Sequence, residues 1–235
     1  MTVLGGILTA IGKGTKGMDR YAFLQLVREI LGDDLLQEKG EVLYNSIDTL
    51  APNDVYLAGY NPGGIGHRSI SEDILQDQYN QPGRSKFDEP WANKLYGTRT
   101  KELLTHLGYD YHTVFITNTF FSASPTESSL PPMSDDTRQR YMRMHHKLLS
   151  IVQPRYVICR GQSAFRQFRE WADERIPVFD EELNDGRFYR ALYPEIKPVI
   201  LIGVRHSRGP APTEEFYNRF RKLRQSPPVV EKHEH

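Results

Sequence analysis

The sequence predicts an α/β protein, a three-layer α/β/α sandwich around a short four-stranded parallel sheet. The first observation behind this prediction is a set of four short apolar runs without polar alternation, which is typical of strands buried on both faces. The second is that segments with helical spacing of apolar residues separate these runs. The third is a composition of 38% hydrophobic and 26% charged residues, as in globular domains.

The four apolar runs set the boundaries of the predicted strands. Their sequences are DVYLAG (54–59), HTVFITN (112–118), RYVICRG (155–161) and KPVILIGV (197–204). Each run is continuously hydrophobic, so both of its faces are expected to be covered by helices. This property favours a parallel sheet.

Helices are predicted between the strands and towards both ends of the chain. We expect them over 18–34, 91–108, 135–153 and 162–174, with a closing helix that begins at Thr213. These segments repeat apolar residues at helical spacing, which gives each helix one face to bury.

Local signals mark two of the turns between elements. Ser134 is placed to cap the helix over 135–153, and Pro154 follows its end. Asp185-Gly186, within the segment 179–192, is a dipeptide typical of tight hairpin turns.

A chain of 235 residues is long enough for one domain with a sizeable core. We assign the domain to residues 1–225, with residues 1–50 as a helical extension packed on it. Residues 226–235 are expected to form a loose C-terminal tail. No run of about 18 apolar residues occurs, so no membrane span or membrane partner is expected.

Cysteine count and net charge exclude several classes of protein. The single cysteine, Cys159, rules out a disulfide framework within the chain and a four-cysteine iron–sulfur cluster, and no cofactor or metal is expected. The N-terminus lacks the basic segment of a signal peptide, so a cytoplasmic location (nuclear in a eukaryote) is predicted. Thirty basic and thirty acidic residues argue against indiscriminate nucleic-acid binding, but they allow a local basic face.

Three of the predicted strands are followed by polar residues that can carry chemistry. Asn61 follows the first strand, Asn118 ends the second, and His206 follows the fourth. Ligands of open parallel sheets collect beyond the carboxyl ends of the strands, so these side chains are expected near one another. The third strand ends in RGQSAF, where Gly161 and Ser163 offer nothing obviously catalytic.

Each of these features has a structural explanation when it is taken alone. GYNPGG (59–64) can be a simple chain reversal, and it is neither a Walker A loop nor a dinucleotide-binding motif. Asn118 can bond neighbouring backbone, and His206 can be an ordinary surface histidine. The adjacent pair His145 and His146 lacks the spacing of a metal site. The combination of three strand ends is therefore more informative than any one motif.

The order of GYNPGG, FITNTFF and VRHSRG along the chain resembles the uracil-DNA glycosylase superfamily. The likeness is to its mismatch-specific thymine/uracil and single-strand-selective branches, whose first motif has the form G-x-N-P-G. It spans roughly residues 54–224, and PRYVICRGQSAFRQF fits the third strand and following helix of that family.

The resemblance implies a monofunctional DNA glycosylase, which flips a base out of the DNA and hydrolyses its N-glycosidic bond to leave an abasic site. Asn61 would position the attacking water, Asn118 would bond the Watson–Crick edge of the base, and His206 would stabilise the departing base. The same resemblance gives further residues a role: phosphate contacts by Pro62, Gly63, Gly64 and Ser207, a duplex-filling wedge at Arg208, and base stacking by Tyr79, with Phe87 and Trp91 as alternatives.

Two positions depart from the family pattern. The last motif lacks the proline that is common between the residues equivalent to His206 and Ser207, which changes that loop. Gly63 stands where the most uracil-restricted branch has a tyrosine that excludes the thymine methyl group. A glycine there leaves room for bulkier bases, so Gly63 is also a candidate for base recognition.

Four functions remain open at this point. The first is excision of uracil or a modified pyrimidine in DNA repair, and the second is excision of unusual bases from foreign DNA, such as phage DNA. The third is a catalytically silent nucleic-acid-binding protein, and the fourth is a hydrolase of free nucleosides or nucleotides. The expected partner is single- or double-stranded DNA, and the protein is expected to be a monomer.

Overall fold

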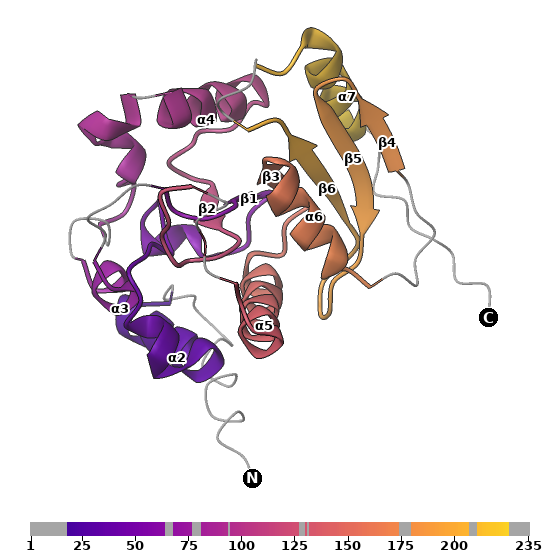
Figure 1. Ribbon diagram of the computed structural model, residues 1–235. Coiled ribbons are helices and arrows are strands. Elements are labelled where there is room, and N and C mark those ends of the chain that lie inside the picture. The colour runs from indigo at the N-terminus through magenta and orange to yellow at the C-terminus, as the bar shows by residue number, and fades with distance from the viewer. Residues whose placement is uncertain are drawn as a thin grey trace, which may run out of the picture.

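The computed structural model describes residues 18–63, 68–76, 81–93, 95–126, 130, 132–173, 180–206 and 211–225 (Figure 1). The predicted α/β class is confirmed: a six-stranded, mixed and mostly parallel sheet is flanked by helices. The strand order is β2-β1-β3-β6-β5-β4. Its four parallel strands are β1 (Val55–Gly59), β2 (Phe115–Asn118), β3 (Tyr156–Arg160) and β6 (Val199–Val204).

The sheet is wider than the four strands expected from the sequence. A hairpin of β4 (Asp180–Leu183) and β5 (Gly186–Ala191) adds two antiparallel strands beside β6. The hairpin lies where the sequence predicts one, and Leu183 pairs with Gly186 across its turn. The hairpin joins the sheet because β5 buries Phe188, which stacks on Phe216 with 5.1 Å between ring centroids.

The helices of the described ranges are α2 (Arg20–Leu36), α3 (Ile70–Ile74), α4 (Leu95–His106), α5 (Asp135–Val152), α6 (Gln162–Glu170) and α7 (Glu214–Gln225), with short 3-10 turns η2 (Ile47–Thr49), η4 (Lys86–Asp88) and η5 (Pro90–Asn93). Five of these helices lie in the predicted segments, with α2 ending two residues later than predicted, and the short helix α3 was not predicted. Ser134 caps α5 as predicted, since its hydroxyl accepts a hydrogen bond from the Thr137 amide at 3.1 Å. None of the helices in these ranges is long and apolar enough to cross a membrane.

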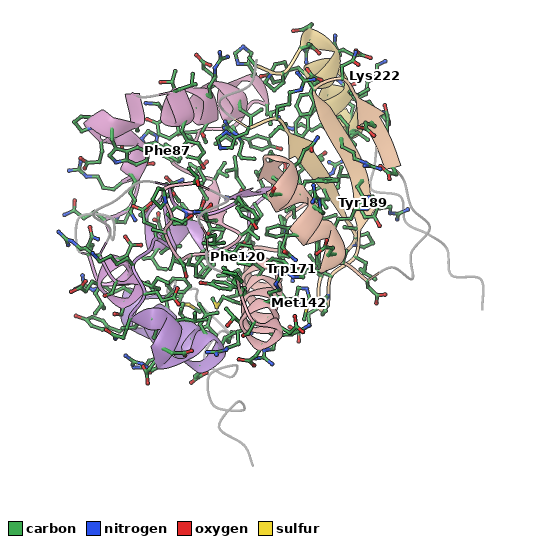
Figure 2. All side chains as sticks on the ribbon, in the orientation of Figure 1. Phe87, Phe120, Met142, Trp171, Tyr189 and Lys222 are labelled. Carbon is green, nitrogen blue, oxygen red and sulfur yellow. The ribbon has the colours of Figure 1, made fainter. Side chains whose placement is uncertain are left out.

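Hydrophobic side chains fill both faces of the sheet (Figure 2). Along β1, Tyr56 and Ala58 belong to a core shared with α2, α5 and α6, whereas Val55 and Leu57 belong to a second core shared with α4 and α7. This alternation is the two-residue period of a strand whose two faces are both covered. The burial of each strand on both sides leaves the strand ends as the places where polar side chains gather.

One buried histidine anchors the backbone beside a predicted site residue. His145 of α5 is fully buried, its Nε2–H donates to the carbonyl of Thr119 at 2.9 Å, and its Nδ1 accepts from the hydroxyl of Tyr56 at 2.6 Å. A carbonyl only accepts, so these contacts define the neutral tautomer. Burial lowers the pKa of His145 to about 3. The bond to Thr119 fixes the chain just after Asn118.

We expect this histidine to make the fold sensitive to acid. In the unfolded chain its pKa is about 6.5, so below that pH the unfolded state binds a proton that the folded state does not. The free energy of unfolding should therefore fall by up to about 1.4 kcal/mol per pH unit between about pH 6.5 and pH 3. Urea unfolding at a series of pH values measures this slope. If His145→Gln keeps the full slope, another group is responsible.

Candidate active site

The carboxyl ends of the parallel strands bring the predicted residues to one edge of the sheet. Gly59 pairs with Asn118 at the ends of β1 and β2, and Arg160 pairs with Val204 at the ends of β3 and β6. The segments that follow β1 and β2 run side by side, with backbone bonds from Thr119 N to Gly59 O (2.8 Å) and from Phe120 N to Tyr60 O (2.9 Å).

The Asn61 side chain is held by the segment that follows β2. Its Nδ2 donates to the Ser124 hydroxyl at 2.9 Å and to the Pro62 carbonyl at 3.0 Å, and the Ser124 carbonyl lies at 3.4 Å. Ser124 is itself tied to this loop through a bond from its amide to the Pro62 carbonyl at 3.0 Å. All the side-chain bonds use Nδ2, so the acceptor Oδ1 has a fixed orientation. Ser124 holds the Asn61 amide, and no sequence motif marks it.

The Asn118 side chain is buried with one half of its amide engaged. It is 1% exposed, and its Nδ2 donates to the Tyr44 hydroxyl at 3.0 Å. Its Oδ1 has no hydrogen-bond partner within the described residues. Gly59 faces this oxygen, since a Cβ on Gly59 would lie 2.5 Å from it. A glycine is therefore required opposite Asn118.

A polar network fixes which way the Asn118 amide points. The Tyr44 hydroxyl is hydrogen-bonded to the Glu41 carboxylate, which only accepts, so the Tyr44 oxygen is left to accept from Asn118. Burial is the main cause that raises the pKa of Tyr44 well above its ordinary value, so the hydroxyl keeps its proton. Lys86 supports the network, because its Nζ lies 3.6 Å from Glu41 Oε1 and 2.5 Å from Asp73 Oδ1.

His206 lies beyond β6, near Gly161 and the ring of Tyr96. A Cβ on Gly161 would lie 3.7 Å from the His206 ring, and the Tyr96 and His206 ring centroids are 6.5 Å apart. The Tyr96 hydroxyl in turn lies 3.0 Å from the position of a Gly59 Cβ. Gly161 has φ of 100°, a left-handed conformation that favours glycine. Tyr96 thus links the neighbourhoods of Asn118 and His206.

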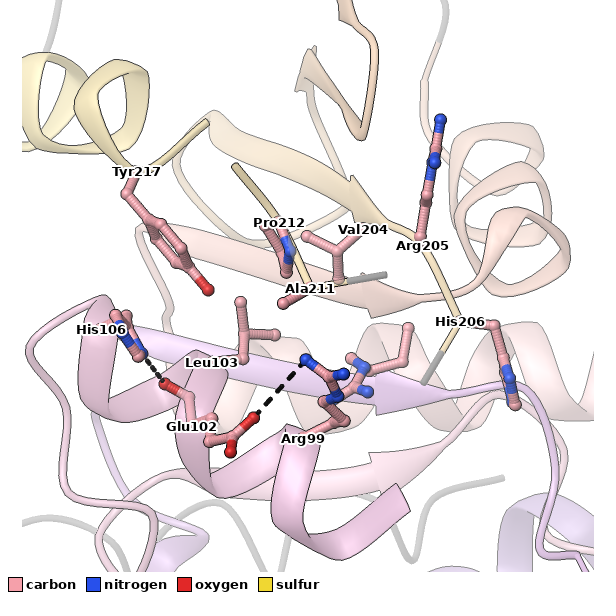
Figure 3. Close-up of a pocket in the computed structure, with 11 residues that line it drawn as sticks. Arg99, Glu102, Leu103, His106, Val204, Arg205, His206, Ala211, Pro212 and Tyr217 are labelled. Atoms are coloured by element: carbon pink, nitrogen blue, oxygen red, sulfur yellow. Dashed lines mark hydrogen bonds and ion pairs between the residues drawn. The ribbon is translucent and has the colours of Figure 1, made fainter. Parts of the chain in front are cut away.

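A small cavity opens next to His206 (Figure 3). It has a volume of about 100 Å³, and its polar lining includes Arg99, Glu102, Arg160 and His206. Arg160 ends β3 and is 3% exposed. No chemistry is expected from sequence at this strand end, because an arginine that closes an apolar strand resembles an ordinary surface residue. Its burial depends on α4, which packs over it.

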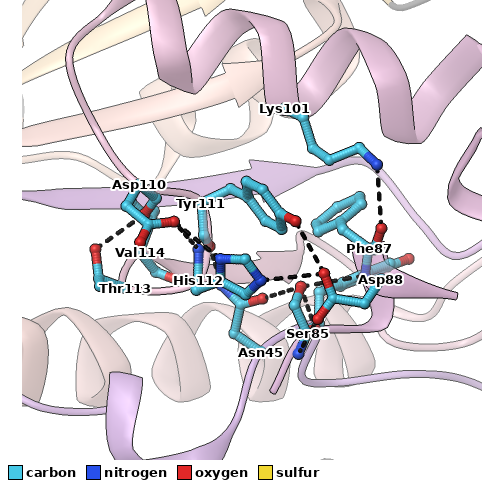
Figure 4. Close-up of polar contacts among 11 residues, drawn as sticks. Asn45, Ser85, Phe87, Asp88, Lys101, Asp110, Tyr111, His112, Thr113 and Val114 are labelled. Carbon is cyan, nitrogen blue, oxygen red and sulfur yellow. Dashed lines mark hydrogen bonds and ion pairs between the residues drawn. The ribbon is translucent and has the colours of Figure 1, made fainter. Parts of the chain in front are cut away.

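The aromatic residues proposed for base stacking differ in burial. Phe87 is buried and stacks on Tyr44 with 5.5 Å between centroids, so it is a core residue, whereas Trp91 is 37% exposed. Polar contacts fasten the segment that carries Phe87 (Figure 4): Asp88 accepts from the Tyr111 hydroxyl at 2.9 Å and lies 3.1 Å from His112 Nε2.

Of the remaining predicted site residues, Gly63 and Pro62 lie within the described ranges. Among the described residues, no atom lies within 4 Å of the position of a Gly63 Cβ. Pro62 lies next to Asn61, and its carbonyl is engaged as described above. The other predicted residues lie outside the described ranges: Gly64, Tyr79, Ser207 and Arg208.

Comparisons with known proteins give no family for this chain. No family model matches it, and no curated protein matches it either. Across the described ranges, no group of three or more His, Cys, Asp or Glu side chains is arranged to hold a metal ion. Arguments about function therefore rest on the geometry of the site.

Proposed function

We propose that this protein is a DNA glycosylase related to the uracil-DNA glycosylase superfamily, in its three-layer α/β/α form. The observation that carries the proposal is the buried, unpartnered Oδ1 of Asn118 at the same sheet edge as Asn61 and His206. An unsatisfied acceptor in a protein interior is unfavourable by about 1–3 kcal/mol, which suggests a ligand that supplies the missing donor.

The polarity of the Asn118 amide favours a particular edge of the base. Its Nδ2 is taken by Tyr44, so Oδ1 is the group that remains to meet a ligand. An acceptor selects a base with an N–H at that position, such as N3–H of uracil or the exocyclic amine of a cytosine derivative. Since Asn118 is 1% exposed, a base flipped out of the DNA reaches Oδ1 only after the side chains that cover Asn118 move.

The reaction would be the hydrolysis of the bond between the base nitrogen and sugar C1′. Asn61 Oδ1 accepts a hydrogen bond from water and directs its oxygen to C1′, where charge builds up as the bond to the base breaks. The bond electrons leave with the base, and His206 donates a hydrogen bond to a base carbonyl to stabilise that anion. The oxygen of the water bonds to C1′, its proton passes to the departing base anion through solvent, and the products are a neutral free base and an abasic strand. The amide of Asn61 is neutral, so its contribution is position.

The described residues leave the position of a Gly63 Cβ without a neighbour within 4 Å, which favours bases larger than uracil within this proposal. A methyl or hydroxymethyl group on carbon 5 of a pyrimidine would find room there. This observation keeps excision of modified bases, including those of foreign DNA, as the second candidate function.

A panel of DNA strands tests the proposed activity. Oligonucleotides with one uracil, one mismatched thymine or one hydroxymethylated cytosine are incubated with the protein and then treated with alkali, which cleaves at abasic sites. We expect cleavage at the target position for at least one of these bases. Intact strands throughout the panel would contradict excision of uracil, thymine and hydroxymethylcytosine.

A further inference from the structure

Arg160 is a buried cation without a carboxylate partner. Its guanidinium donates to the Thr100 hydroxyl at 2.7 Å and lies 5.5 Å from the centre of the Tyr96 ring. Its Nε is buried without a hydrogen-bond partner, and among the described residues no carboxylate forms an ion pair with it. An unpaired buried charge is strongly unfavourable, so a purely structural arginine would be expected to have an acidic partner.

A second guanidinium faces the same space. Arg99 of α4 lines the cavity together with Arg160, and repulsion between the two contributes to a lowered pKa of Arg160, after the larger effect of burial. The one carboxylate in the lining is Glu102, 3.8 Å from Arg99. Arg205 also belongs to the lining, but it turns away from Arg99, and its guanidinium donates to the Asn184 carbonyl (Figure 3).

The size of the cavity limits what it can hold. Its volume of about 100 Å³ is below the roughly 300–1,000 Å³ of pockets for drug-sized molecules. A single compact anion fits these dimensions, whereas a whole nucleoside does not. Guanidinium groups suit the oxygens of phosphate, because their planar N–H donors bond two oxygens at once.

We propose that this cavity binds a phosphate group, with Arg160 and Arg99 as its ligands. The phosphate supplies the anionic partner that the Arg160 guanidinium lacks among the described residues, and it separates the two like charges. His206 lines the same cavity, so a phosphate bound there lies beside the proposed catalytic histidine. This position suits a backbone phosphate of the DNA next to the flipped nucleotide, an assignment that rests on the proposed function. A free phosphate ion is the other source of the same chemistry.

Binding of inorganic phosphate tests the site without any assay of base release. Calorimetric titration and thermal melting are compared at constant ionic strength for the wild type, Arg99→Gln, Arg160→Gln and a control, Arg143→Gln. Arg143 is exposed on α5, which packs against the other face of the sheet. We expect phosphate to bind and to raise the Tm of the wild type and the control. Each of the two site variants should weaken phosphate binding by about tenfold or more.

Two results would overturn the phosphate site. One is a wild type that phosphate stabilises no more than chloride does. The other is an Arg99→Gln variant that folds normally and binds phosphate as the wild type does. Arg99 is partly exposed, so this variant remains informative even where Arg160→Gln fails to fold.

The dependence of DNA affinity on salt identifies the source of the phosphate. If the site takes a DNA phosphate, inorganic phosphate competes with DNA, and Arg99→Gln lowers the slope of log K against log salt by about 0.7–0.9. If the slope and the DNA affinity are unchanged while phosphate binding is lost, the site takes a free phosphate, and the DNA assignment is wrong. The phosphate titration and the DNA-binding assay both measure binding and do not depend on base release. A protein that releases no base would therefore contradict the proposed function without contradicting the phosphate site.

Discussion

Replacing Asn61 with alanine is expected to abolish base release while the protein still binds DNA. The amide is held through Nδ2 by Ser124 and Pro62, and its role in the proposed reaction is to direct a water through Oδ1. Loss of such positioning lowers the rate by at least about 100-fold. Single-turnover release of the base identified by the panel measures the rate, and a gel shift measures DNA affinity.

A graded control separates catalysis from loop structure. Ser124→Ala removes one acceptor of the Asn61 amide but keeps the Pro62 carbonyl, so we expect a rate between those of the wild type and Asn61→Ala. If Asn61→Ala loses DNA binding together with base release, Asn61 is a structural residue. If its rate equals that of the wild type, the proposed role of Asn61 is wrong.

Replacing Lys86 with methionine is expected to destabilise the fold by about 3 kcal/mol or more, because it leaves buried carboxylates without their cation. Lys86 is 3% exposed and lies 2.5 Å from Asp73 Oδ1 and 3.6 Å from Glu41 Oε1. Burial already raises the pKa of Asp73 against the opposing effect of Lys86. Without Lys86 this pKa should rise further.

The sign of the pH dependence follows from that shift. A folded-state pKa above the unfolded value means that the folded protein binds the extra proton, so stability is lost as the pH rises. The loss of unfolding free energy caused by Lys86→Met should therefore grow from about pH 4 upwards and become smaller in acid. Arg28→Met is the matched control, because Arg28 pairs with Asp33 at an exposed site, where loss of a pair changes stability by up to about 1 kcal/mol. This account would be contradicted if both variants lost the same unfolding free energy relative to the wild type. It would also be contradicted if the loss in Lys86→Met did not depend on pH.

The parts of the fold that the sequence predicted are those with local causes. Continuous apolar runs located the four parallel strands, and the Ser134 cap located the start of α5. The turn of the hairpin was also visible, but its addition to the sheet was not, because pairing of β5 with β6 depends on contacts such as Phe188 with Phe216.

The candidate site was predictable to the extent that it depends on strand ends. Asn61, Asn118 and His206 follow buried strands, and parallel topology is enough to bring strand ends to one edge. The polar network joins Asn118 to Tyr44, 74 residues earlier in the sequence, and to the neighbouring Glu41, so no local spacing reveals it. Arg160 was missed for the same reason, since its burial is created by α4.

The central claim is that a base is released after its Watson–Crick N–H meets Oδ1 of Asn118. The most direct measurement compares the release of one base with that of the same base lacking this donor. For uracil, the blocked form is N3-methyluracil. Thymine is its control, because it also carries one extra methyl group but keeps the N3–H donor. For a cytosine derivative, the blocked form is the N4,N4-dimethyl base. The account predicts release of the unblocked base together with an abasic strand, and retention of the blocked base. Equal release of both forms, or release of no base at all, would contradict it.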